Sequence, residues 1–104
     1  MDIENILALN PLIHAPVRLA ILSALITVDS VRFAFLKEVT RATDGNLSTH
    51  LSKLEKAGYV DINKEFVGKK PQTNCSITEK GREAFQLYIT KLEAILQQQQ
   101  TESN

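Results

Sequence analysis

The chain has 104 residues, 43% of them hydrophobic, and its 12 basic side chains balance its 12 acidic ones. This length and composition predict one globular domain, residues 1–104, and exclude a disordered chain. The single cysteine, Cys75, excludes an internal disulfide, and no cysteine or histidine stands at the spacing of a zinc site. We therefore expect neither a metal nor another cofactor.

Several functional classes find no support among the motifs of the chain. No nucleophile elbow, phosphate-binding glycine loop or zinc-protease motif occurs, so we do not expect an enzyme. Asp2 and Glu4 stand where a secretory signal would be basic, and the longest nearly apolar run, residues 19–26, is too short for a bilayer. These features predict a cytoplasmic protein without membrane contact.

The first third of the chain predicts an arm and two helices. Residues 1–14 form the N-terminal arm, with room for one short helix, and Pro16 suits the first turn of the next helix. Only two of residues 17–26 are polar, which is typical of a buried helix. A short edge strand is expected at 31–33. The second helix, ending near Ala42, has apolar residues at helical spacing, namely Phe35, Leu36 and Val39.

A third helix is predicted over residues 44–57, with Thr43 or Asp44 as its cap. Its apolar stripe, which faces the core, consists of Leu47, Leu51 and Leu54. Gly58 follows, where a left-handed helix stop is favoured. Two helices joined by a short turn that contains a glycine form a helix-turn-helix pattern.

Beyond Gly58 the period changes from 3.6 to 2, which indicates strands. The inward-facing residues of the first strand are expected to be Val60, Ile62 and Phe66. Those of the returning strand are Thr73, Cys75 and Ile77. The loop at 67–71 makes these strands a hairpin, and its tip carries Lys69 and Lys70.

The last helix is predicted over residues 78–97, with Thr78 as its cap and a flexible polar tail at 98–104. Its apolar stripe is wider than one small domain needs, so we expect a homodimer that is held by this surplus, the N-terminal arm and the first helix. The predicted dimer contacts are Leu12, Phe85, Tyr88, Ile89, Leu92, Ile95 and Leu96.

Four segments, at 16–22, 44–60, 66–71 and 78–82, resemble winged-helix regulators of the multiple-antibiotic-resistance (MarR) and arsenic-sensor (ArsR) types. The likeness extends over residues 10–96. It implies an α+β, mainly α, winged helix-turn-helix fold: a three-helix core, a β-hairpin wing and a long C-terminal helix. It also implies a transcriptional regulator, most simply a repressor, that binds double-stranded DNA as a homodimer. The cysteine-rich metal motif of the arsenic-sensor type is absent, which argues against metal sensing.

The recognition helix would be residues 44–57, in the major groove, and the wing residues 67–72, on the DNA backbone or in the minor groove. Residues 41–73 hold six basic and four acidic side chains, so the middle of the chain is its basic part. The predicted DNA contacts are Arg41, Asn46, Ser48, Thr49, Ser52, Lys53, Lys56, Lys69, Lys70 and Gln72.

Each of these interpretations has a plainer alternative. Every surface helix has a polar side, a turn can carry lysines for solubility, and Arg41 can pair with a helix dipole. His50 is more simply a partly buried structural residue than a DNA contact, and Cys75 an inert buried thiol than a redox sensor. The zero net charge would also suit a winged helix that binds protein without specific DNA binding. A small-molecule effector is left open.

Overall fold

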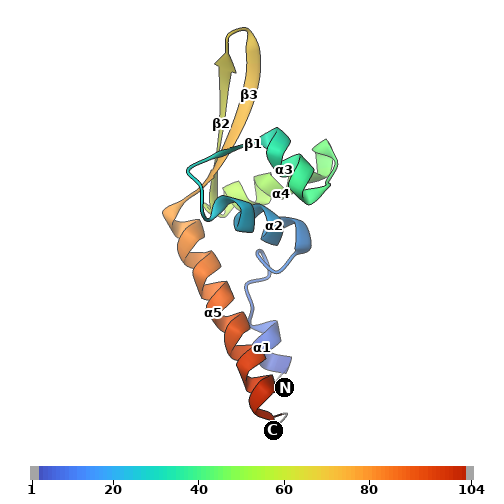
Figure 1. The fold of residues 1–104 in the computed structure, drawn as a ribbon, viewed down its shortest axis with the longest axis vertical. Helices are drawn as coiled ribbons and strands as arrows, with labels where there is room; N and C mark the ends of the chain where they lie inside the picture. The colour runs from blue at the N-terminus through green and yellow to red at the C-terminus, as the bar shows by residue number, and fades with distance from the viewer. Residues whose placement is uncertain (1–2, 103–104) are drawn as a thin grey trace.

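The structure, a computed structural model, describes residues 3–102, with side chains up to residue 98. Its elements are α1 (Ile3–Leu7), α2 (Pro16–Leu25), β1 (Val31–Arg32), α3 (Phe33–Thr40), α4 (Asp44–Lys56), β2 (Val60–Val67), β3 (Lys70–Ile77) and α5 (Glu79–Glu102). Figure 1 shows α2, α3 and α4 packed into a central body, with the β2–β3 hairpin projecting from one end and α5 from the other. The fold is α+β and mainly helical, as predicted.

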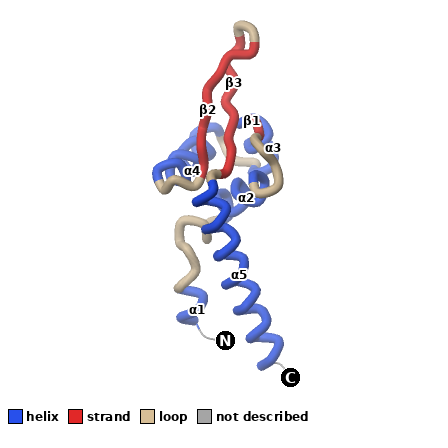
Figure 2. The backbone as a smooth tube through the Cα atoms, turned by 90° about the vertical axis from the view of Figure 1, so that its left-hand side faces the viewer, coloured by secondary structure: helices blue, strands red, loops and turns tan. Residues whose placement is uncertain are grey.

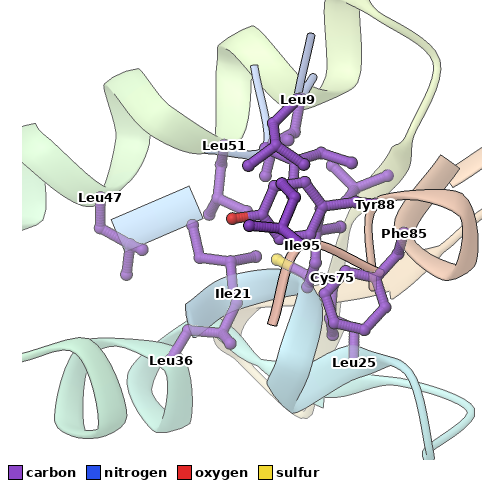
Figure 3. Packing of buried hydrophobic residues seen from close by; sticks show 14 residues of the cluster. Leu9, Ile21, Leu25, Leu36, Leu47, Leu51, Cys75, Phe85, Tyr88 and Ile95 are labelled. Carbon is purple, nitrogen blue, oxygen red and sulfur yellow. The ribbon is translucent and has the colours of Figure 1, made fainter. Parts of the chain in front are cut away.

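The core lies where α2 meets the other two helices of the body. Ile21, Leu22 and Leu25 of α2 are fully buried, and Val17, Leu19 and Ala24 pack against the core partly buried, which explains why this helix is apolar almost all round. They pack with buried side chains of α3, α4, β3 and α5, and Figure 3 labels several of these: Leu36, Leu47, Leu51, Cys75, Phe85 and Tyr88. Burying each such leucine contributes about 2 kcal/mol to folding.

The three strands form an antiparallel sheet in the order β1-β3-β2. Val31 of the short β1 lies opposite Cys75, so β1 covers only the base of β3, as expected for an edge strand. In the hairpin, Val67 pairs with Lys70 across a two-residue turn in which Gly68 has a φ of +67°. The predicted loop at 67–71 was therefore too long. Gly68, with its positive φ, allows a turn of only two residues, so the flanking residues stay paired in the strands.

The helix ends follow the local signals of the sequence. The Thr43 hydroxyl accepts a hydrogen bond from the Asn46 N–H at 3.2 Å, so Thr43 rather than Asp44 caps α4. Gly58 ends the same helix with a φ of +81°, as predicted. The Thr78 hydroxyl accepts from the Gly81 N–H at 2.9 Å and thereby caps α5.

The start of α5 lies directly against the end of α4. The Thr78 hydroxyl donates to the Gly58 carbonyl at 2.6 Å, and the Thr78 N–H donates to the Tyr59 carbonyl at 2.9 Å. A β-carbon added at Gly81 would lie 2.1 Å from that same Tyr59 oxygen, so only glycine fits there. Arg82 adds a further bond, from its guanidinium to the Ile26 carbonyl at 2.8 Å. This α4–α5 junction sets the direction in which α5 leaves the body.

Three further boundary and burial predictions were wrong. The helix predicted to end near Ala42 ends at Thr40, because Arg41 adopts a left-handed conformation with a φ of +56°. On the same helix only Leu36 is buried, whereas Phe35 and Val39 are about half exposed. A helix of eight residues has only about two turns, so only one narrow side of it faces the core.

In the hairpin, Phe66 is 74% exposed because the strand runs on past the body. The last helix continues through Glu102 into the predicted tail, since glutamine favours helix. The end of that tail, residues 103–104, lies outside the described residues.

Below the body, α1 and the second half of α5 form what we call the stalk (Figures 1 and 2). Ile95 is buried there together with Leu9, which follows α1, and the Asn5 side chain donates to the Gln98 side chain at 3.2 Å. The arm of residues 1–14 thus contains one short helix from residue 3 onward, and this helix packs on α5. None of the helices in residues 3–102 is long and apolar enough to cross a membrane.

Candidate nucleic-acid interface

The turn between α3 and α4 holds the front of α4 in place. Besides the Thr43 cap, Lys37 of α3 forms an ion pair with Asp44 at 2.8 Å. Both side chains are largely exposed, so this pair contributes less than about 1 kcal/mol to stability. It nevertheless neutralises a carboxylate at the helix end that would otherwise repel phosphate.

The polar side of α4 faces solvent as a continuous surface. Leu47, Leu51 and Leu54 are buried, and all the predicted DNA-contacting residues of this helix are exposed: Asn46, Ser48, Thr49, Ser52, Lys53 and Lys56. A polar helix face with amide, hydroxyl and ammonium groups can meet the base edges and phosphates of a major groove.

Thr49 has its hydroxyl proton already engaged. The hydroxyl donates to the Gly45 carbonyl, one turn earlier, at 2.9 Å. It therefore offers an acceptor and a methyl group outward, a combination that suits the amino group of adenine or cytosine and the methyl group of thymine. No such restriction acts on Asn46, whose side-chain amide carries both donors and acceptors.

A groove of about 600 Å³ separates α4 from the base of the hairpin. Ser48 and Ser52 line it from α4, and Lys64 and Thr73, which lie opposite each other in the hairpin register, line it from the strands. Lys64 is a basic group on this side of the hairpin that the predicted set of DNA contacts omitted. The strand period could have identified it, because it shares a face with Val60 and Ile62.

The other predicted hairpin contacts lie elsewhere. Lys69 stands in the turn itself, whereas Lys70 and Gln72 belong to the opposite face of the hairpin. The Gln72 amide donates to the Asn74 side chain at 3.1 Å, and Asn74 donates in turn to Glu65. All these side chains except the half-buried Gln72 and Asn74 are exposed.

Acidic residues of the hairpin are kept to that opposite face. Asp61 and Glu65 alternate with Lys64 along β2, so their side chains point away from the groove. Glu55 is the carboxylate that does line the groove. The even balance of charge over the whole chain thus conceals an uneven distribution, with Lys53, Lys56 and Lys64 exposed around the α4 face and groove.

Arg41 lies between α3 and α4 with an exposed side chain. Its N–H donates to the Lys37 carbonyl at 2.9 Å, which closes α3, but among the interactions of residues 3–98 none engages its guanidinium. A left-handed conformation costs a non-glycine residue about 1 kcal/mol. The turn therefore keeps a strained arginine whose charge is available to a ligand.

His50 is partly buried, as predicted, and makes a contact that sequence reasoning missed. Arg18 of α2 donates from Nη1 to His50 Nδ1 at 3.0 Å and from Nε to the Leu12 carbonyl of the arm. Burial lowers the pKa of His50, and the positive charges of Arg18 and Lys53 lower it further. Arg18 and His50 are far apart in the chain, so only the fold reveals that the neutral imidazole links α4 to the arm.

The thiol of Cys75 is fully buried, and burial, with the nearby Glu55 carboxylate, raises its pKa to about 11. The reactive form of cysteine is the thiolate, so this thiol is inert at neutral pH. In the part of the chain that the structure describes, no three His, Cys, Asp or Glu side chains gather as a metal site would require.

The predicted dimer contacts fall into two groups. Phe85, Tyr88 and Ile95 are buried by their own chain, and the Tyr88 hydroxyl lies 2.7 Å from His14 Nδ1. The remaining contacts keep exposed surface: Leu12, Ile89 and Leu92 are half-buried and Leu96 is 52% exposed. The stalk adds two exposed side chains that the sequence analysis did not name, Ile3 and Leu7.

Comparison with known proteins agrees with this geometry. Residues 17–96 match the family model described as a winged helix DNA-binding domain. An uncharacterised protein of Methanocaldococcus jannaschii is 40% identical over 79 residues, which cover 76% of this chain and 86% of that protein.

Solved structures show the same fold. A transcriptional regulator homologue from Pyrococcus horikoshii superposes with a TM-score of 0.82 at 28% identity, over 91% of this chain and 93% of the other. An ArsR family transcriptional regulator superposes with a TM-score of 0.56 at 15% identity, over 93% and 95% of the two chains. The chain therefore belongs to the winged helix DNA-binding family and is a DNA-binding regulator, not an enzyme.

Proposed function

We propose that the protein is a sequence-specific transcriptional repressor that binds an inverted DNA repeat as a homodimer. In this proposal α4 enters the major groove and the hairpin reaches the flanking backbone or minor groove. The observation that carries it is the continuous polar face of α4, with six exposed polar residues, facing a groove whose other wall presents Lys64.

The dimer part of the proposal is supported by the stalk. Ile3, Leu7 and Leu96 are each more than half exposed, although they lie on two helices that pack together. Exposed apolar side chains in water favour association, and a two-fold partner would cover them. Two copies would also present two α4 helices, which matches the symmetry of an inverted repeat.

The test is selection of bound sequences from random duplex DNA, followed by titration of the selected site at two salt concentrations. We expect an enriched inverted repeat and an affinity that falls steeply with salt, because lysine contacts release counterions. Light scattering on the same protein should give the mass of a dimer. A winged helix that binds protein instead would return no enriched motif and only weak binding that does not depend on sequence.

A further inference from the structure

The tip of the hairpin, residues 66–71, carries apolar side chains that the rest of the described chain leaves uncovered. Phe66 is 74% exposed and Val67 is 59% exposed, and no other large apolar side chain in residues 3–98 is as exposed as Phe66. Figures 1 and 2 both show the tip projecting beyond every other element. Its apolar surface is thus available to a partner and contributes nothing to the core.

The strand register places Phe66 on one particular face of the hairpin. Residues directly opposite share a face, so Phe66 and Pro71 lie on the same side as Lys64 and Thr73. Toward the body the same face becomes buried, at Cys75. The Phe66 ring therefore continues the wall of the groove that Lys64 and Thr73 share with α4, whereas Val67 points to the other side.

Charge at the tip indicates what kind of partner would fit. Lys69 and Lys70 adjoin the apolar residues, and residues 66–71 contain no acidic side chain. The two carboxylates of the hairpin, Asp61 and Glu65, lie on the face that Phe66 does not occupy. An apolar side chain flanked by cations is the combination with which proteins enter a DNA minor groove: the cations hold phosphates while the apolar group separates neighbouring bases.

We propose that Phe66 is an intercalating wedge, which enters the minor groove beside the α4 site and partly unstacks one base step. This inference rests on the proposed function, because it assigns the tip a role on the DNA that α4 reads. Lys64 and Lys69 hold the phosphates on either side of the wedge. Pyrimidine–purine steps unstack most easily, so the flank of the operator should favour such a step without any hydrogen bond to its bases.

The test uses the full-length protein and its selected operator, with 2-aminopurine placed in turn at each flanking position. Unstacking of this base raises its fluorescence. We expect the signal to rise at one step when the wild-type protein binds, and not to rise with Phe66→Ala, whose affinity should fall about tenfold. Phe66→Leu keeps an apolar wedge and should retain most of the signal.

Val67→Ala is the matched control, since it removes an exposed apolar side chain from the same tip but from the opposite face. It should leave affinity and fluorescence at their wild-type values. If selection returns no operator, the proposed function is wrong, and so is the wedge, because there is no operator for it to enter.

If an operator is bound but the 2-aminopurine fluorescence rises at no flanking position, the proposal that Phe66 is an intercalating wedge is wrong. It is equally wrong if Phe66→Ala binds as tightly as Val67→Ala. A change of mass in light scattering caused by Phe66→Ala, with DNA affinity unchanged, would assign the tip to contacts between copies and overturn the proposal.

Discussion

At the scale of single residues, the site combines ordinary surface groups with a few held in unusual states. Arg41 is strained, Thr49 has its proton engaged, and His50 is kept neutral by burial and by neighbouring cations. None of these states is visible in a residue's type. Each follows from a neighbour that the fold supplies.

Protonation of His50 should weaken the fold. Because its folded pKa lies below 6.5, the unfolded chain binds the proton more tightly. The free energy of unfolding should therefore be unaffected above pH 6.5 and fall as the pH drops from there toward the folded pKa. Urea unfolding at pH 8 and pH 5 measures the difference. His50→Asn, which keeps an acceptor for Arg18 but does not titrate, should show a smaller loss of stability between the two pH values. Equal losses in the wild-type protein and in His50→Asn would exclude this role.

Arg41→Gly should separate stability from binding. Glycine adopts a φ of +56° without strain, so the free energy of unfolding should stay the same or rise by up to about 1 kcal/mol. Affinity for DNA should nevertheless fall for all sequences alike, and the salt dependence should lose about one unit of slope, because one phosphate contact disappears. Thermal unfolding and titrations at several salt concentrations measure the two effects. An unchanged slope would show that Arg41 is a helix terminator alone.

At the scale of elements, local signals predicted most of the fold. Pro16, Thr43, Gly58 and Thr78 mark helix ends through their own backbone and side-chain chemistry, so their roles could be inferred without a structure. The exposure of Phe66 could not, because alternation along a strand tells which face a side chain occupies but not whether anything covers it. The contact of Arg18 with His50 depends on how α2 crosses α4, which the sequence does not encode locally.

Two glycine-to-alanine changes in helices should have opposite effects. A β-carbon at Gly81 would lie 2.1 Å from a backbone oxygen, so Gly81→Ala should destabilise the protein by at least about 2 kcal/mol. At Gly45 in the first turn of α4 the β-carbon meets nothing within 4 Å, so Gly45→Ala should stabilise it by about 0.5–1 kcal/mol through helix propensity. Urea denaturation compares them. Equal effects would mean that the α4–α5 junction is looser than described.

At the scale of the whole molecule, the shape is elongated, with extents of 61 × 26 × 21 Å, and the apolar surface proposed for the dimer lies at the end of the molecule away from the hairpin. The sequence predicts that the surplus of the α5 stripe serves the dimer, with Phe85, Tyr88 and Ile95 among the contacts. The fold uses Phe85, Tyr88 and Ile95 for its own core, so a variant at these positions would test folding rather than association.

Leu7→Lys combined with Leu96→Lys is the sharper test of the dimer. Both side chains are more than half exposed, so the change should leave the fold intact while placing charge in the proposed interface. Light scattering at tens of micromolar should show the dimer give way to a monomer, and affinity for the inverted repeat should fall with it. Val39→Lys, at a similarly exposed apolar residue on α3, is the control and should keep the wild-type mass. A wild-type protein that is monomeric at this concentration would contradict the proposal.

The α4–α5 junction has a mechanical consequence for the proposed dimer. With Gly81 pressed on the Tyr59 backbone and Thr78 bonded to both Gly58 and Tyr59, a tilt of α5 carries α4 with it. A helix of 24 residues is about 36 Å long. If α5 rotates by about 5° about its C-terminal end, its other end, and α4 with it, moves by about 3 Å. That distance is close to the rise of one base pair, about 3.4 Å. Small rotations between the stalks of the two protomers would therefore be enough to move the two α4 helices into or out of register with the DNA helix.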